Sequence, residues 1–409
     1  MVDAALPTIP SGASTSPVAF ELLCACGRAK PNVAQKQRIA DWNFAGFGWE
    51  EFLDLAERHG VLALAARNLS AYARNLPQEI QQSLTSEYAA NLRRNLWFAG
   101  ELARIVDHLK KNDVRAIPYK GPVLAQSAYG DVGLRSFFDL DLLISPADFS
   151  SAKKALREIG YHPSQEFSPA VERLFLRTGY ERSFNGPAAN NLLELQWSLL
   201  PYLYALDSES AAFASGDLIA RSGRIRLGAA EVPCLSPEDS LLVSCLHAAK
   251  HLWTRLIWIA DIAESLHAPE LDGSQVVSRA REMGIARILG VSCWLAKRLL
   301  AAEVPPGARK VFDADADVER LGATYAARLA RAATYNFNST DYFRRIWRLR
   351  ERPSDRSRYL WRLAWTPGPG DIAAIELPEI LFPLYGIVRT GRLLRSLSRR
   401  LRPGSALPV

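Results

Sequence analysis

The stretch "YKGPVLAQSAYGDVGLRSFFDLDLLIS", residues 119–145, ends in an apolar segment that Asp139 and Asp141 interrupt. Because a β-strand points successive side chains to opposite faces, the two aspartates are expected to share one face. The other face would carry Phe138, Leu140, Leu142 and Ile144. Adjacent carboxylates repel one another and are costly to bury. The pattern therefore predicts either a divalent metal site or a half-solvated strand at the edge of a sheet.

Composition and charge are those of an ordinary globular protein, long enough for two or more hydrophobic cores. The 409 residues are 48% hydrophobic and carry a net charge of +7. This modest positive excess suits anionic ligands such as nucleotides. It is too weak to indicate nucleic-acid binding, and no run of basic and aromatic residues suggests an RNA-binding platform, so no nucleic acid is expected as a partner.

The cysteines and the N-terminal segment indicate the cellular compartment of the protein. The five cysteines are odd in number and lack C-x-x-C spacing, which predicts free thiols in a reducing compartment. The N-terminal segment lacks the basic start and apolar centre of a signal peptide, and no apolar stretch reaches transmembrane length. The sequence therefore favours a cytoplasmic, soluble protein whose residues 1–17 form a disordered leader.

The spacing of apolar residues predicts an α+β fold in which a small mixed sheet is flanked by two helical regions. Residues 18–112 have helical periodicity, and His59 and His108 are expected to have structural roles there. Residues 113–205 form the predicted core, and residues 206–409 form the C-terminal helical region. The predicted strands of the core are residues 114–119, 137–144, 180–184 and 191–197, and its predicted helices are residues 121–129 and 146–160.

The last of these strands contains "LELQW", in which Glu194 and Gln196 share a face. If this strand lies beside the strand of Asp139 and Asp141, three carboxylates converge on one point. Together with triphosphate oxygens, they form the ligand set that a pair of Mg²⁺ ions needs. Taken alone, the strand pattern favours a Glu194 that is simply exposed at the surface.

The order of motifs along the chain resembles the family known as uncharacterised nucleotidyltransferases, in the DNA polymerase β-like superfamily. The motifs are Lys-Gly at 120–121, Tyr129, Arg135, Asp-x-Asp at 139–141, a helix that begins with Pro and ends in Gly-Tyr at 160–161, and a Glu-x-polar-Trp strand at 194–197. The later segments "SPEDSLLVSCLHAAKHLWTRLIWIADIAE" and "WTPGPGDIAAIELPEILFPLYGIVRTGRLL" are also similar to the family. The resemblance therefore extends over residues 18–402.

The resemblance implies both metal ligands and nucleotide-binding residues. Its catalytic residues and ligands of Mg²⁺ or Mn²⁺ would be Asp139, Asp141 and Glu194. Gly121 would begin the helix that cradles the phosphates, where free backbone N–H groups and the helix dipole favour anions. Lys120 and Arg135 would neutralise phosphate charge.

The implied reaction moves an NMP group from an NTP, with ATP the expected donor, to a hydroxyl or similar group of an acceptor. The acceptor would be a small molecule, a peptide or a protein. Two positions depart from the pattern: Pro122 stands where the wider superfamily has Ser, and Gln196 stands where the family tends to have His. Because an amide cannot act as a base, a catalytically silent protein that binds a nucleotide or a partner on the same fold is the alternative.

A single helix predicted over residues 241–264 carries His247, His251 and Arg255 on one stripe. The family resemblance includes these positions, which favours a role in lining the nucleotide or acceptor pocket. Hydrogen bonding between packed helices is the alternative role for the two histidines. Zinc is not expected, because the H-x-x-x-H spacing has no evident third ligand.

The chain ends in a basic, amphipathic segment, "RTGRLLRSLSRRLRPGS", whose leucines share one helical face: Leu393, Leu397 and Leu401. Such a helix could dock on a partner protein or on an anionic membrane surface. Packing on its own protein, with the arginines in solvent, is the simpler expectation.

Overall fold

The computed structural model describes residues 16–188, 191–204, 214–337, 339–368, 371–372, 375 and 377–401. It contains a mixed five-stranded sheet, a separate hairpin and many helices, which confirms the α+β prediction. Most of the predicted leader, residues 1–15, lies outside the described residues. All five cysteines are free, as predicted.

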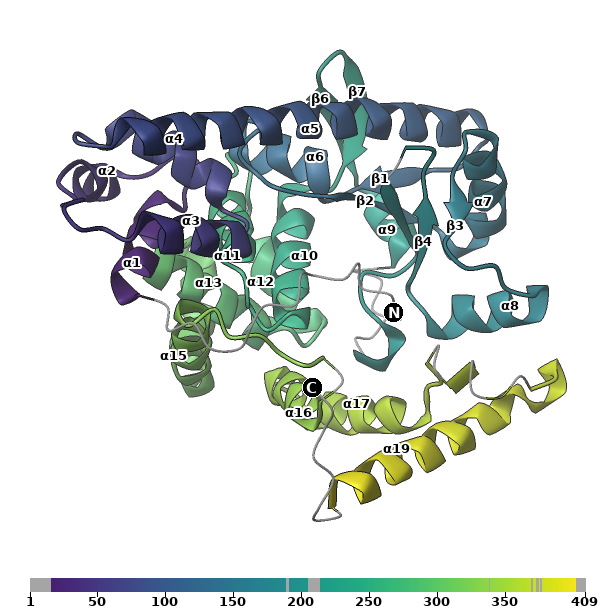
Figure 1. Cartoon of the computed structure of the whole chain (residues 1–409). Coiled ribbons are helices and arrows are strands. Elements are labelled where there is room, and N and C mark those ends of the chain that lie inside the picture. The colour runs from purple at the N-terminus through teal and green to yellow at the C-terminus, as the bar shows by residue number, and fades with distance from the viewer. Residues whose placement is uncertain are drawn as a thin grey trace.

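The N-terminal region is helical, as the periodicity predicts. Its helices are α1 (Pro17–Cys26), α2 (Val33–Ala40), α3 (Trp49–Arg58), α4 (Leu62–Tyr72) and α5 (Gln78–Lys111). The long α5 helix runs from the other N-terminal helices across to the sheet (Figure 1). His59 is buried and accepts a hydrogen bond from the Leu256 backbone, and His108 pairs with Glu158. Both histidines therefore have structural contacts, as expected.

The core sheet has the strand order β1-β2-β5-β4-β3. Its strands are β1 (Ala116–Pro118), β2 (Asp139–Ile144), β3 (His162–Pro163), β4 (Glu181–Asn185) and β5 (Leu192–Gln196). β2 and β5 are parallel, and the other neighbours are antiparallel. Because β2 lies between two strands, the prediction of a half-solvated edge strand is wrong.

One face of the sheet packs against α5 and α7 (Phe149–Glu158). Leu140, Leu142 and Ile144 point into this hydrophobic core, as the alternation predicts. Phe138 does not, because it precedes the strand and is 62% exposed, while Phe137 is buried in its place. The opposite face carries the aspartates and is covered in part by α9 (Ser215–Ala220) and α10 (Pro237–Lys250) through a small apolar cluster.

The remaining elements of the core are short. They are α6 (Gly121–Leu124), the π-helical turn η1 (Ala125–Tyr129), the 3-10 turns η2 (Pro146–Asp148) and η3 (Tyr202–Tyr204), and α8 (Pro169–Thr178). The predicted helix over residues 121–129 is therefore present as α6 and η1. Sequence analysis did not identify α8 or β3.

A hairpin lies within the range assigned to the C-terminal helical region, and its strands are β6 (Gly223–Leu227) and β7 (Ala230–Cys234). Gly228 has φ +62 in the two-residue turn, a conformation that favours glycine. Leu227 and Val232 join the hydrophobic core of the sheet. The assignment of residues 223–234 to a helical region is therefore wrong, because tertiary packing on the sheet core stabilises this short hairpin.

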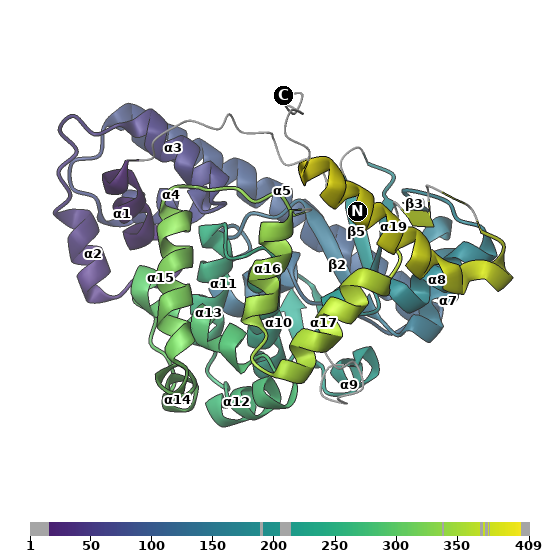
Figure 2. The ribbon, with the colours of Figure 1, turned by 90° about the horizontal axis from the view of Figure 1, so that it is seen from below.

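The C-terminal region is helical from α10 onward. Its further helices are α11 (Leu256–Ser265), α12 (Gly273–Glu282), α13 (Ala286–Leu300), α14 (Pro306–Ala314), α15 (Ala316–Ala330), α16 (Thr340–Leu349), α17 (Pro353–Trp365), the 3-10 helix η5 (Glu379–Leu384) and α19 (Tyr385–Leu401). Viewed from below, α17 and α19 lie side by side (Figure 2). None of the helices in the described ranges is long and apolar enough to cross a membrane.

The single helix predicted over residues 241–264 is two helices, α10 and α11. Leu252 and Trp253, in the connection, have φ values of 52 and 51, which end helical geometry. Trp253 is fully buried, and its indole N–H donates to Ser292 in α13 at 3.1 Å. Burial of this large side chain between helices therefore overrides the apolar periodicity that predicted one continuous helix.

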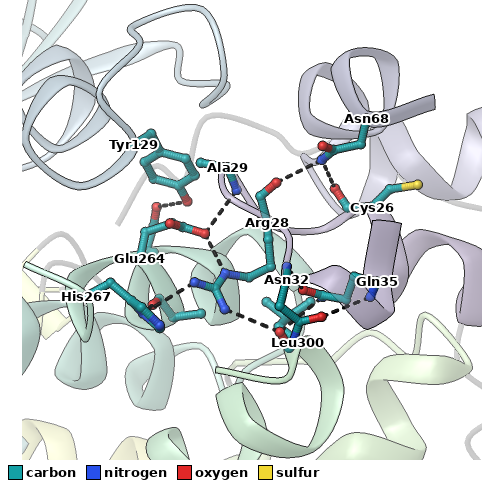
Figure 3. Close-up of polar contacts among 12 residues, drawn as sticks. Cys26, Arg28, Ala29, Asn32, Gln35, Asn68, Tyr129, Glu264, His267 and Leu300 are labelled. Carbon is teal, nitrogen blue, oxygen red and sulfur yellow. Dashed lines mark hydrogen bonds and ion pairs between the residues drawn. The ribbon is translucent and has the colours of Figure 1, made fainter. Parts of the chain in front are cut away.

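The two helical regions share one hydrophobic core, which contains residues of α1–α4 and of α10–α15. A buried ion pair joins them, because the Arg28 Nε, after α1, donates to Glu264 in α11 at 2.6 Å (Figure 3). Glu264 also accepts from the Ala29 backbone N–H at 3.0 Å. Helices α1–α4 and α10–α15 therefore form one unit beside the sheet.

Candidate active site

The two strands that carry the predicted carboxylates are neighbours, as the prediction required. Asp141 of β2 is opposite Glu194 of β5 in the parallel register, and Asp139 precedes Asp141 on the same face. Asp141 is only 3% exposed, and Asp139 and Glu194 are half-buried. The three carboxylates therefore converge on one face, and the alternative of a fully exposed Glu194 is wrong.

A fourth carboxylate, which sequence analysis missed, joins them from β4. Glu181 is opposite Gln196 in the antiparallel register of β4 and β5. Gln196 shares its face with Glu194, so Glu181 lies on that face too. Glu181 is visible in the sequence as a charged residue inside the predicted strand 180–184. Which residues it lies beside depends on the register between strands, which the sequence does not show.

The Gln196 amide connects the carboxylates. Its Nε2 is within 3.1–3.2 Å of acceptor oxygens on three of them: Asp141, Glu181 and Glu194. Its Oε1 accepts a hydrogen bond from the Tyr119 hydroxyl. Gln196 therefore organises the cluster, although its amide cannot act as a base.

The negative charge of the cluster is only partly compensated. The Lys120 Nζ donates to Asp141 Oδ1 at 3.0 Å. Burial, together with repulsion by Asp141, raises the pKa of Asp139 to about 6, although Lys120 opposes the rise. Burial, followed by repulsion by Glu181, raises the pKa of Glu194 well above its ordinary value. Buried acids with raised pKa values, close to a specific charge partner, are typical of functional sites.

The chemistry of these donors fits Mg²⁺ or Mn²⁺, which bind through a few carboxylates together with waters and substrate phosphates. Across the described ranges, no three His, Cys, Asp or Glu side chains are already arranged around one point as a metal cage. Lys120 and Gln196 instead contact Asp141 directly. A divalent cation would replace these contacts, so the site fits the ion by charge and donor type rather than as a preformed cage.

A small pocket beside the carboxylates lies between the sheet and α10. Lys120, Tyr180, Gln196, His247 and Lys250 are among its lining residues. The Lys250 Nζ donates to the Tyr180 hydroxyl at 2.8 Å and lies 4.7 Å from the centre of that ring. The sequence places Lys250 close to the stripe of His247, His251 and Arg255 but indicates no role for it, and it gives no signal for Tyr180. The pocket encloses about 10 Å³, room for about one water, so a triphosphate would have to lie across its open side.

The predicted stripe of His247, His251 and Arg255 does not line one pocket. His247 lines the pocket beside the carboxylates, whereas His251 stacks on Trp258 with ring centres 4.8 Å apart. The Arg255 Nε donates to the Arg58 carbonyl at 3.0 Å. The two histidine rings still lie together, with centres 4.8 Å apart, although α10 ends before His251. Burial lowers the pKa of both histidines well below the ordinary value, which keeps them neutral.

Gly121 and Arg135 lie close to the cluster but differ in their freedom to bind phosphate. Gly121 begins α6 with φ +54, and a Cβ there would lie 3.4 Å from the Asp139 carbonyl oxygen, so the helix start contacts β2 closely. Arg135 is buried and donates to the Asp261 carboxylate at 2.8 and 3.0 Å, and the Tyr129 hydroxyl donates to the same carboxylate. In this structure the Arg135 side chain therefore joins the core to α11, and its phosphate role stays a prediction.

Comparison with known proteins identifies the family. Residues 45–301 match the family model described as "Uncharacterised nucleotidyltransferase", which is more than half of the chain. The chain therefore belongs to this family of nucleotidyltransferases, as the motif order predicted. No curated protein matches it.

Among solved structures, the solution structure of the antibiotic-resistance factor ANT(2'')-Ia is similar at 12% sequence identity. The similarity covers 57% of this chain and 92% of that chain, with a TM-score of 0.27.

Proposed function

We propose that this protein is a metal-dependent nucleotidyltransferase that moves an NMP group from an NTP, with ATP the expected donor, to a hydroxyl or similar group on a small molecule, peptide or protein. The observation that supports the proposal is the convergence of Asp139, Asp141 and Glu194 on one sheet face. Burial and mutual repulsion raise the pKa of Asp139 and of Glu194, so keeping both carboxylates ionised costs folding free energy. A purely structural core gains nothing from repelling charges, whereas a site for a cation requires them.

The same three carboxylates would hold Mg²⁺ or Mn²⁺, which when bound supplies neutralisation of phosphate charge and activation of the acceptor hydroxyl. Lys120, once released from Asp141, would contact the phosphates, and Lys250, which lines the same pocket, would provide a second ammonium group. In the described part of the chain, Lys250 contacts the Tyr180 hydroxyl and has no ion-pair partner. Both cations therefore suit the triphosphate.

Transfer requires in-line attack by the acceptor oxygen on the α-phosphorus. The new phosphorus–oxygen bond forms as the bond to the β-phosphate breaks, and pyrophosphate leaves with that electron pair. The acceptor proton moves to a nearby carboxylate, for which Glu181 is our candidate, since it borders the cluster without belonging to the predicted ligand set. Positioning and charge neutralisation, rather than covalent catalysis, would therefore drive the reaction.

One observation favours the second candidate function, a catalytically silent protein that binds a nucleotide or a partner. Lys120 and Gln196 already satisfy Asp141, and Gln196 also contacts Glu181 and Glu194. A site stabilised in this way could hold a nucleotide without transferring it.

Substitution of Glu194 by Gln separates the two functions, because it preserves shape and removes one metal-ligand charge. We expect metal-dependent nucleotide binding to weaken modestly, while pyrophosphate release in the presence of Mg²⁺ and a cell extract of candidate acceptors falls at least about 100-fold. The matched control is Glu231→Gln on the exposed hairpin, which should leave both measurements unchanged. Equal pyrophosphate release by wild type and Glu194→Gln would refute the site. Nucleotide binding without pyrophosphate release from any NTP would favour the silent protein.

A further inference from the structure

The C-terminal helices expose large apolar side chains that the proposed reaction does not use. We define the C-terminal apolar patch as Trp361 and Trp365 of α17, Ile380 of η5 and Ile387 of α19. These residues are 64%, 43%, 86% and 60% exposed, respectively. Isolated exposed apolar residues are ordinary, whereas a contiguous group marks an interaction surface.

Contacts within the structure make this patch contiguous. The Trp361 and Trp365 rings are stacked, with centres 5.6 Å apart and planes inclined by 10°. Trp365 packs against the backbone of Gly386, since a Cβ there would lie 2.5 Å from its ring. Trp365, Gly386 and Ile380 also line one groove between α8, α17, η5 and α19. Ile387 is the next residue of α19, turned about 100° away from Gly386 around the helix, so it lies beside the groove rather than in it and adds an exposed aliphatic side chain at the margin of the patch.

The patch lies on strongly basic helices. α17 contains three arginines and one acidic residue, and α19 contains five arginines and no acidic residue. Two of these, Arg389 and Arg392, pair with the same carboxylate of Asp371. Across the groove, α8 contributes Arg173, which pairs with Glu379, and Arg177. Positive charge therefore exceeds negative charge around the exposed apolar residues.

This combination of features determines the kind of partner. A second copy of the chain would bring two basic surfaces together, which charge repulsion opposes. Nucleic acid would satisfy the arginines, but it would leave Ile380 and Ile387 without an apolar environment. An anionic lipid surface suits both the arginines and the exposed apolar side chains, because its head groups attract arginine and its acyl boundary accepts tryptophan and isoleucine.

We propose that the C-terminal apolar patch and the surrounding arginines dock the protein on the surface of an anionic phospholipid bilayer. Aliphatic side chains would enter the acyl boundary and the tryptophans would lie at the head-group level. The exposed arginines of α19, Arg392 and Arg395, would contact lipid phosphates. Docking would hold the core at the membrane surface, because Arg173 of α8 contacts Glu379 of η5. This inference is independent of the proposed transfer reaction.

The test is flotation of the full chain with vesicles of phosphatidylcholine alone or mixed with phosphatidylglycerol. We expect binding to the anionic vesicles, weakening as salt is raised, and at least about tenfold weaker binding to the neutral vesicles. Ile380→Glu and Ile387→Glu should each reduce binding to the anionic vesicles about tenfold or more. The matched control is Val33→Glu, which introduces the same change at an 83% exposed position on α2 and should bind like wild type.

Because all three substituted side chains are exposed, circular dichroism melting should show unchanged folding. Failure of the full chain to float with anionic vesicles at low salt would overturn the proposal. So would equal losses in Val33→Glu and the patch variants, or full binding by both patch variants. Binding of single-stranded RNA together with no flotation would replace the lipid surface with nucleic acid. At matched ionic strength, inorganic phosphate should displace no more protein from the vesicles than chloride does, and greater displacement by phosphate would indicate a simple anion site instead.

Discussion

Replacement of Asp139 by Asn should make the metal-free protein more stable while it removes the proposed function. Burial and repulsion by Asp141 raise the pKa of Asp139 from 3.8 to about 6, against the opposing effect of Lys120. At about 1.4 kcal/mol per pKa unit, the ionised carboxylate costs the fold up to about 3 kcal/mol. Because the side chain is half-buried and partly screened by solvent, we expect about 1–2 kcal/mol.

The effect should depend on pH in a defined direction. An acid whose pKa is raised by folding binds its proton more tightly in the folded state. The stabilising contribution of the Asp139 proton to the free energy of unfolding is therefore complete below the unfolded pKa of 3.8. It is lost as the pH rises through the folded pKa of about 6. Asn has no such dependence, so wild type and Asp139→Asn should have similar stability near pH 4. At about pH 8, the variant should be the more stable protein.

The assay is chemical denaturation in EDTA at about pH 4 and about pH 8, repeated with Mg²⁺ and ATP at the higher pH. Metal and nucleotide should stabilise wild type more than the variant. Asp107→Asn is the control, because Asp107 pairs with Lys111 on the surface of α5 and lies far from the cluster in sequence. A variant less stable than wild type in EDTA at about pH 8 would refute the reasoning, since Asp139 would then make a favourable structural contact. Equal stabilisation of both proteins by Mg²⁺ and ATP would refute its role in metal binding.

Two further predictions concern the helices. Glu264→Gln should lower the free energy of unfolding by about 3–5 kcal/mol in urea denaturation, because it leaves the buried Arg28 guanidinium without a counter-charge. The control Glu231→Gln, in an exposed ion pair, should change the free energy of unfolding by less than about 1 kcal/mol. Similar losses in both variants would contradict the role of the buried pair. Lys250→Met should weaken binding of Mg²⁺–ATP about tenfold in calorimetric titration, since it removes one phosphate-binding cation. The control Lys111→Met, on the surface of α5, should bind Mg²⁺–ATP like wild type. Unchanged affinity in Lys250→Met would exclude Lys250 from the nucleotide site.

Local patterns were sufficient to predict the strands of the site and the faces of its carboxylates. The period of two within a strand places Asp139 with Asp141, and Glu194 with Gln196, without any knowledge of the fold. The order of motifs then predicted the nucleotidyltransferase family, which the family match confirms. These inferences succeed because they depend on neighbours within a few residues or on the order of elements along the chain.

The tertiary structure decided which of these groups meet and which cations accompany them. Glu181 joins the cluster through the register of β4 against β5, and Lys250 reaches the pocket from a helix that follows the core. Arg135, predicted to bind phosphate, pairs with Asp261, 126 residues further along the chain. Burial of Trp253 ended a helix that periodicity would have continued. The physical reason is the same in each case, because long-range packing and charge pairing are set by the assembled fold and leave no local pattern in the sequence.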